Sequence, residues 1–143
     1  MSRPIAGLLG SGDRFEEHSA LNIFMVSGNP AADEKIRRDF SQCSLRIAGG
    51  VNRYPASEEL RTLLDRAEAD IVFLDSTGFQ DVLRICAAVE ASHPGVPIVV
   101  IGVPEDGNKL LHLLRAGVRE VLAFPVVKED LSAAVANVAR FIS

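Results

Sequence analysis

Short apolar runs without polar alternation constrain the fold of this chain more than any other feature. Ile71–Leu74 and Ile98–Ile101 consist entirely of apolar residues, most of them β-branched. A strand covered on one face alternates apolar and polar side chains, whereas a strand covered on both faces is apolar throughout. These runs therefore predict parallel strands buried between two layers of helices.

Helical patterns separate the apolar runs. Strands are expected at Leu21–Val26, Ser44–Ala48, Ile71–Leu74, Ile98–Ile101 and Val121–Phe124. After each strand, apolar residues recur every three or four positions, which is the spacing of one helix face; an example is Ile36, Phe40 and Cys43. Five strands alternating with five helices predict one α/β domain with a doubly wound parallel sheet.

Turn and cap residues support these boundaries. Asn29 followed by Pro30 is typical of a helix start, because Asn accepts free N–H groups and Pro suits the first helical position. Pro94 ends the third helix, and Gly117 supplies a left-handed cap to the fourth. Gly49-Gly50 is interpreted as the end of the second strand.

Length, charge and apolar content limit the class of protein. With 143 residues, 48% hydrophobic and 24% charged, the chain is ordinary for one globular domain. A net charge of -4 argues against nucleic-acid binding, which favours a basic face. No stretch approaches the roughly 18 apolar residues of a membrane span, and residues 1–20 resemble no signal peptide. We expect an N-terminal arm at 1–20, a domain at 21–143, and a cytoplasmic location without membrane insertion.

Motifs for enzymatic chemistry are weak. The glycine-rich segment Gly7–Gly12 lacks the Gly-Lys-Ser/Thr ending of a phosphate-binding loop. Cys43 and Cys86 are far apart and have no zinc-type spacing, so two buried thiols are expected. The three histidines have no Ser, Cys or Asp partner at the spacing of a catalytic motif.

Asp75 is the principal candidate site residue. It closes the run Ile71–Leu74, and the carboxyl ends of buried parallel strands are where α/β sheets present chemistry to solvent. A structural role is the alternative, in which the carboxylate accepts hydrogen bonds from the Ser76 or Thr77 amides or from Ser27.

Four segments, taken in order, resemble the response-regulator receiver domain of the CheY-like family. They are Phe24–Pro30, Ala69–Asp75, Pro97–Ile101, and Leu114–Gly117 with Glu120–Pro125. The second resembles the strand that ends in the family's phosphoacceptor aspartate. The resemblance covers about residues 21–142 and implies a flavodoxin-like, five-stranded parallel sheet with strand order 2-1-3-4-5. It also implies a cis peptide between Phe124 and Pro125.

The same resemblance implies a phosphorylation pocket in which several family residues are replaced. Two acids after the first strand, which hold Mg²⁺ together with the acceptor aspartate, correspond to Ser27 and Gly28. The lysine of the fifth strand corresponds to Phe124, and the hydroxyl residue ending the fourth strand corresponds to Gly102. Val121 stands where the family has its switch aromatic.

These replacements weaken the expected chemistry. Mg²⁺ requires oxygen ligands in near-octahedral geometry, so its binding is expected to be weak or absent, and no other cofactor is expected. Little positive charge would lie near a phosphoryl group on Asp75 to offset the negative charge of that group. Asp75 is therefore a phosphoacceptor candidate in a degenerate pocket, and no catalytic residue or enzymatic activity is expected.

The degenerate pocket, a short loop after Asp75 and the segment Arg115–Pro125 resemble the atypical N-terminal receivers of TadZ/CpaE-type pilus-assembly proteins. An ATPase domain follows the receiver in that family. The resemblance implies that this chain is either the first domain of a longer protein or a stand-alone relative. It implies protein partners in the pilus or secretion machinery, or signalling proteins.

An interaction surface is expected where the fifth strand meets the last helix. Exposed apolar patches mark partner sites, and receivers dimerise through their fourth helix, fifth strand and fifth helix. A homodimer is therefore expected through Leu111, Val121, Phe124, Pro125, Val126 and Val127. Alternatively, Phe124 fills the space of the missing lysine while Val126 and Val127 pack under the last helix.

Three functions remain open. The first is a pseudo-receiver that acts as a protein-interaction and localisation module. The second is a phosphorylatable receiver in two-component signalling. The third is a flavodoxin-like small-molecule binder, although Ser27–Pro30 has one glycine and a proline where a phosphate-binding loop needs N–H donors.

Overall fold

The computed structural model describes residues 21–43 and 45–142, and the arm expected at 1–20 lies outside these residues. Five strands are present: β1 (Ile23–Val26), β2 (Ile47–Val51), β3 (Ile71–Asp75), β4 (Ile98–Ile101) and β5 (Glu120–Leu122). The helices are α2 (Pro30–Ser41), α3 (Ser57–Ala67), α4 (Phe79–Ser92), α5 (Gly107–Arg115) and α6 (Lys128–Ala139). The strands form one parallel sheet in the order β2-β1-β3-β4-β5, which confirms the expected fold.

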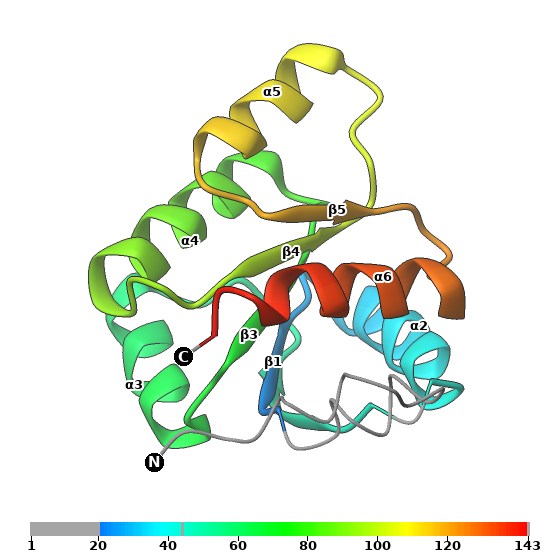
Figure 1. Cartoon of the computed structure of the whole chain (residues 1–143). Helices are drawn as coiled ribbons and strands as arrows, with labels where there is room; N and C mark the ends of the chain where they lie inside the picture. Colours follow the sequence, from blue (N-terminus) through cyan, green and yellow to red (C-terminus); the bar gives the residue numbers. More distant parts are fainter. Residues whose placement is uncertain (1–20, 44, 143) are drawn as a thin grey trace.

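Two hydrophobic cores lie on opposite faces of the sheet. Helices α2 and α6 cover one face, and α3, α4 and α5 cover the other (Figure 1). Every residue of β1, β3 and β4 is buried, which explains their unbroken apolar runs. In the first core, Phe40 of α2 packs edge-on against Phe73 of β3, with ring centroids 5.0 Å apart.

Local signals set the helix ends as expected. The Asn29 side chain accepts a hydrogen bond from the Ala32 N–H at 2.9 Å, so it caps α2. Gly117 follows α5 with a φ of 97°, a left-handed conformation that favours glycine. Both cysteines are buried thiols, as predicted.

The predicted bounds of the second strand were wrong. Ser44–Ala48 was expected, but β2 covers Ile47–Val51 and includes both Gly49 and Gly50. The reason is the neighbouring strand: a Cβ on Gly50 would lie 2.6 Å from the Met25 carbonyl oxygen, and one on Gly49 would lie 3.2 Å from the Phe24 ring. The glycines therefore permit the close approach of β2 to β1 and do not end the strand.

The last strand is also displaced from its expected position. Val121–Phe124 was predicted, but β5 ends at Leu122, whose carbonyl accepts from the Gly102 N–H at 2.7 Å. Phe124 lies beyond the sheet, and its peptide bond to Pro125 is cis, as the resemblance implied. The Val126 N–H then donates to Asp39 of α2 at 3.0 Å, which holds the connection to α6 against the body of the domain.

Replacing Gly50 with alanine should destabilise the fold. The new Cβ would meet the Met25 carbonyl oxygen at 2.6 Å and the Arg37 guanidinium at 2.7 Å, so backbone must shift. We expect a loss of about 1–3 kcal/mol in the free energy of unfolding, measured by urea denaturation. Gly107→Ala is the control, because nothing lies within 4 Å of its Cβ position. Equal stability of the two variants would contradict the packing argument.

Candidate functional site

Asp75 ends the central strand β3 at the carboxyl edge of the sheet and is only 8% exposed. Its Oδ2 atom accepts from the Gly28 N–H at 3.0 Å and from the Thr77 hydroxyl. The Ser76 N–H, which was one of the donors expected for Asp75, donates to the Ile101 carbonyl instead. One carboxylate oxygen is thus held by the β1–α2 turn and by the residues after β3.

Ser27 does not contact Asp75 as the structural alternative proposed. Its side chain is fully buried, and its hydroxyl donates to Asp33 Oδ1 at 3.0 Å. The second oxygen of Asp33 accepts from the Arg37 Nε–H at 2.9 Å. These contacts join the end of β1 to helix α2. The Ser27 hydroxyl is thereby paired with Asp33 and not with Asp75.

Tyr54 is the site residue that the sequence analysis missed. It comes from the loop between β2 and α3, and its hydroxyl donates to the Asp75 backbone carbonyl at 2.7 Å. The Tyr54 hydroxyl oxygen also accepts from the Gly78 N–H at 3.0 Å and lies 3.5 Å from Asp75 Oδ2. Tyr54 therefore fastens the end of β3 to the start of α4.

The Tyr54 ring fills the space next to two glycines. A Cβ on Gly28 would lie 2.6 Å from the ring, and one on Gly78 would lie 2.9 Å from it. No larger residue fits at either position without displacing the ring. The pairing of the chain's single tyrosine with these glycines is not visible as a sequence motif, because the three residues lie in different loops.

Gly102 and Ser76 form the opposite side of the site. Gly102 has a φ of 108°, and a Cβ there would lie 2.5 Å from the Ser76 hydroxyl oxygen. The Ser76 hydroxyl donates to the Gly102 carbonyl at 2.9 Å. The Ser76 hydroxyl therefore occupies the space that a side chain at position 102 would need.

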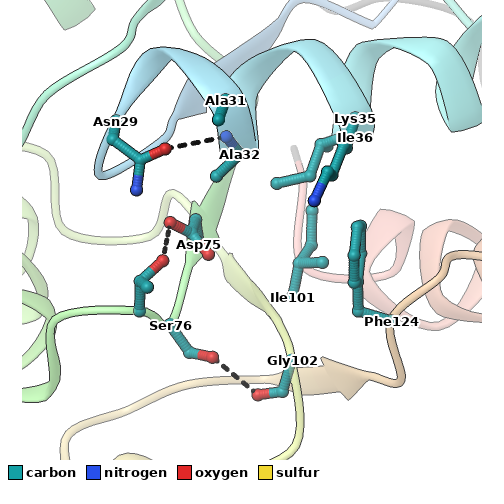
Figure 2. A pocket seen from close by; sticks show the side chains of 11 residues that line it. Asn29, Ala31, Ala32, Lys35, Ile36, Asp75, Ser76, Ile101, Gly102 and Phe124 are labelled. Atoms are coloured by element: carbon teal, nitrogen blue, oxygen red, sulfur yellow. Dashed lines mark hydrogen bonds between the residues drawn. The ribbon is translucent and has the colours of Figure 1, made fainter.

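A cavity of about 380 Å³ opens beside Asp75, between helix α2 and the ends of β3 and β4. Its lining includes Asp75, Gly102 and Phe124 but neither Ser27 nor Gly28. Figure 2 shows Lys35 and Ile36 projecting from α2 on the side of Phe124. Lys35 is a second residue that the sequence analysis did not identify, because it belongs to no motif.

The residues around Asp75 do not fit a magnesium ion. Asp75 Oδ2 is already held by two donors, Ser27 is turned towards Asp33, and the Tyr54 ring occupies the space next to Gly28. Mg²⁺ requires several oxygen ligands at short, near-octahedral positions. No group of three or more His, Cys, Asp or Glu side chains within 21–43 and 45–142 is arranged to hold a metal ion.

The expected interaction surface is only partly exposed. Leu111, Phe124 and Val127 are 41–47% exposed, and Pro125 is also exposed. Val126 was wrongly assigned to this surface, because its side chain is buried in the core beneath α6. Val121 is half-buried and packs against the core on the other face.

None of the helices in the described part of the chain combines the length and apolar character needed to cross a bilayer. No protein-family model matches the chain, and no curated protein sequence matches it. Comparison with solved structures, in contrast, finds many with the same fold.

The fold is that of CheY-like receiver domains. A pilus assembly-related protein from Burkholderia pseudomallei has a TM-score of 0.73 and 22% identity, over 88% of this chain and 94% of that one. The CheY-like protein TadZ from Pseudomonas aeruginosa has a TM-score of 0.65 and 18% identity, over 82% of this chain and 98% of that one. The receiver domain of RcsB from Salmonella enterica has a TM-score of 0.65 and 16% identity, over 86% of this chain and 99% of that one. The structural neighbours thus include both pilus-assembly proteins and signalling regulators.

Titration of Tyr54 should report its environment directly, because the chain has one tyrosine and no tryptophan. Burial raises the pKa of Tyr54 above its usual value of 10.0. The folded protein therefore keeps this proton at a pH where the unfolded chain loses it, and folding stability decreases as pH rises above about 10. Tyrosinate absorbance should show a midpoint above 10 in buffer and near 10 in urea. Identical midpoints would show that the ring is not buried as described.

Proposed function

We propose that this chain is a pseudo-receiver, a protein-interaction and localisation module that acts in the cytoplasm in pilus assembly or secretion. Residues 21–143 would form the receiver-like domain, preceded by an arm at 1–20. The pilus-assembly proteins among its structural neighbours support the cellular process. Its partners would be proteins of the pilus or secretion machinery, and nucleic acid and membrane insertion are not expected.

The observation that carries this proposal is the Tyr54 ring beside Asp75. The ring takes the space next to Gly28, where the resemblance places a metal-binding acid. Phe124 stands at the lysine position, so neither cation that would offset a phosphoryl group is supplied there. We infer that Mg²⁺ binding is weak or absent, that the pocket is degenerate, and that the domain is not an enzyme.

A phosphodonor experiment tests the proposal. The protein is incubated with Mg²⁺ and acetyl phosphate, and intact-mass spectrometry measures any phosphoryl adduct. We expect no adduct at Asp75, because the charge of the phosphoryl group would be poorly compensated. Asp75→Asn, treated in the same way, measures adducts at other residues. A stoichiometric adduct that is absent from Asp75→Asn would contradict the pseudo-receiver function.

That outcome would favour a phosphorylatable receiver in two-component signalling, and one observation supports this second candidate. Lys35 lines the cavity beside Asp75 and could supply positive charge from α2 instead of from the end of β5. Since Lys35 is exposed, its charge would be screened by solvent and weaker than that of a buried lysine. The pseudo-receiver therefore remains the preferred function.

We further propose that the module forms a homodimer through helices α5 and α6 and the segment between β5 and α6. Figure 1 shows α5, β5 and α6 next to one another at one edge of the domain. Leu111 and Leu114 on α5, with Phe124 and Val127 after β5, expose apolar side chains there. Burying this apolar surface against a second copy would stabilise the dimer.

Charged residues on this surface should separate the protomers. Leu111→Asp combined with Val127→Asp places two charges in the proposed interface, where they would lose solvation. We expect analytical ultracentrifugation to show a monomer for this variant and a dimer for the unmodified protein. Ala87→Glu, an exposed position on α4, is the control and should leave the dimer intact. An unchanged mass of the double variant would contradict the interface.

A further inference from the structure

The two carboxylate oxygens of Asp75 have different environments. Oδ2 accepts from the Gly28 N–H and the Thr77 hydroxyl, whereas no residue within 21–43 and 45–142 donates to Oδ1. The residue is only 8% exposed, and buried polar atoms nearly always have a hydrogen-bond partner. In Figure 2 this second oxygen points towards the space enclosed by the labelled residues. A partner for Oδ1 must therefore reach it through the cavity.

The cavity reaches Asp75 from the side of α2 and Phe124, while the Tyr54 ring fills the side next to Gly28. Its volume of about 380 Å³ is within the range of small-ligand sites. The accessible apolar part of the lining comes mainly from Phe124, Ala31 and Ala32, since Ile36 and Ile101 belong to the core and are each 1% exposed. An apolar wall combined with a few polar groups is typical of a site that orients a small organic molecule.

Lys35 adds a positive charge at the edge of this cavity. Its side chain is exposed, and no described carboxylate lies within ion-pair distance of its amine. Asp75 and Lys35 do not form an ion pair with each other, so the negative and positive groups are separated. The cavity therefore offers an acceptor at its inner end, a cation at its edge and apolar surface between them.

We propose that this cavity binds a free α-amino acid with an apolar side chain. The ligand's ammonium group donates to Asp75 Oδ1, its carboxylate accepts from the Lys35 amine, and its side chain packs against Phe124, Ala31 and Ala32. The proposal goes beyond the interaction function and does not depend on it, although Phe124 belongs both to the cavity lining and to the proposed dimer surface.

Other ligand classes match the cavity less well. Phosphate would bring negative charge to a buried carboxylate, with one exposed lysine to offset it. A purely apolar molecule would leave Oδ1 without a donor, which costs free energy in a buried site. An apolar amino acid carries a donor, an acceptor and an apolar body in one small molecule, so it satisfies all three features.

Binding is tested by titrating ¹⁵N-labelled protein with L-leucine and following amide chemical shifts. Two matched compounds each lack one group: 3-methylbutylamine has no carboxylate, and 4-methylpentanoate has no ammonium. We expect saturable shifts with L-leucine at the amides of Ser76, Thr77 and Gly102, which line the cavity. The amine should bind more weakly, and the acid and inorganic phosphate should not bind.

Two variants separate the contributions of the charged groups. Asp75→Asn keeps the shape and an acceptor for Gly28 but removes the negative charge, and Lys35→Met removes the positive charge. Asp75→Asn should weaken L-leucine binding about tenfold, the value of a charge-assisted hydrogen bond. Lys35→Met should weaken it only about two- to fivefold, because the exposed Lys35 charge is screened by solvent. Lys109→Met, which changes a lysine outside this cavity, should bind as the unmodified protein does.

Several results would overturn the proposal. These are no saturable binding of L-leucine, equal binding of 4-methylpentanoate, or unchanged affinity in Asp75→Asn with a well-dispersed, folded spectrum. A loss of binding in Lys109→Met equal to the loss in Lys35→Met would also overturn it. None of these results affects the test of the homodimer, because that test measures mass and not ligand affinity.

Discussion

The burial of β1, β3 and β4 on both faces is the constraint on which the rest of the structure depends. Strands without a solvent-facing side need helices on both faces, and the helical crossovers that provide them make the strands parallel. Parallel strands end at a common edge, so Ser27 and Gly102, which follow β1 and β4, lie near Asp75 at the end of β3. The site is therefore a consequence of how the core is covered.

Packing, more than the loss of acidic residues, determines what this edge presents. Tyr54 enters from a separate loop, fills the space beside Gly28 and fastens Asp75 to Gly78 through one hydroxyl. It thereby closes one side of Asp75, while the other side opens into an apolar cavity with Lys35 at its edge. A receiver fold is thus combined with a site whose shape differs from the one that the resemblance implied.

Local patterns predicted the central strands well, because burial on both faces requires an apolar residue at every position. The edge strands were misplaced for a physical reason. Gly49 and Gly50 are common turn residues, but here they belong to β2 because the Phe24 ring and the Met25 carbonyl leave no room for side chains. The end of β5 depends on hydrogen bonds to β4, which no local pattern records. Val126 was assigned to the surface because its burial results from packing beneath α6, which a local sequence pattern does not reveal.

Residue identity and periodicity alone predict the class of fold and the position of Asp75 at a strand end. The resemblance to receivers adds the expectation that Ser27, Gly28 and Phe124 stand where that family has acids and a lysine. The positions of Tyr54 on one side of Asp75, and of Lys35 and Phe124 in the cavity on its other side, follow from the packed fold. The physical reason is that these contacts join residues 20 to 90 positions apart, and their formation depends on how the helices pack against the sheet.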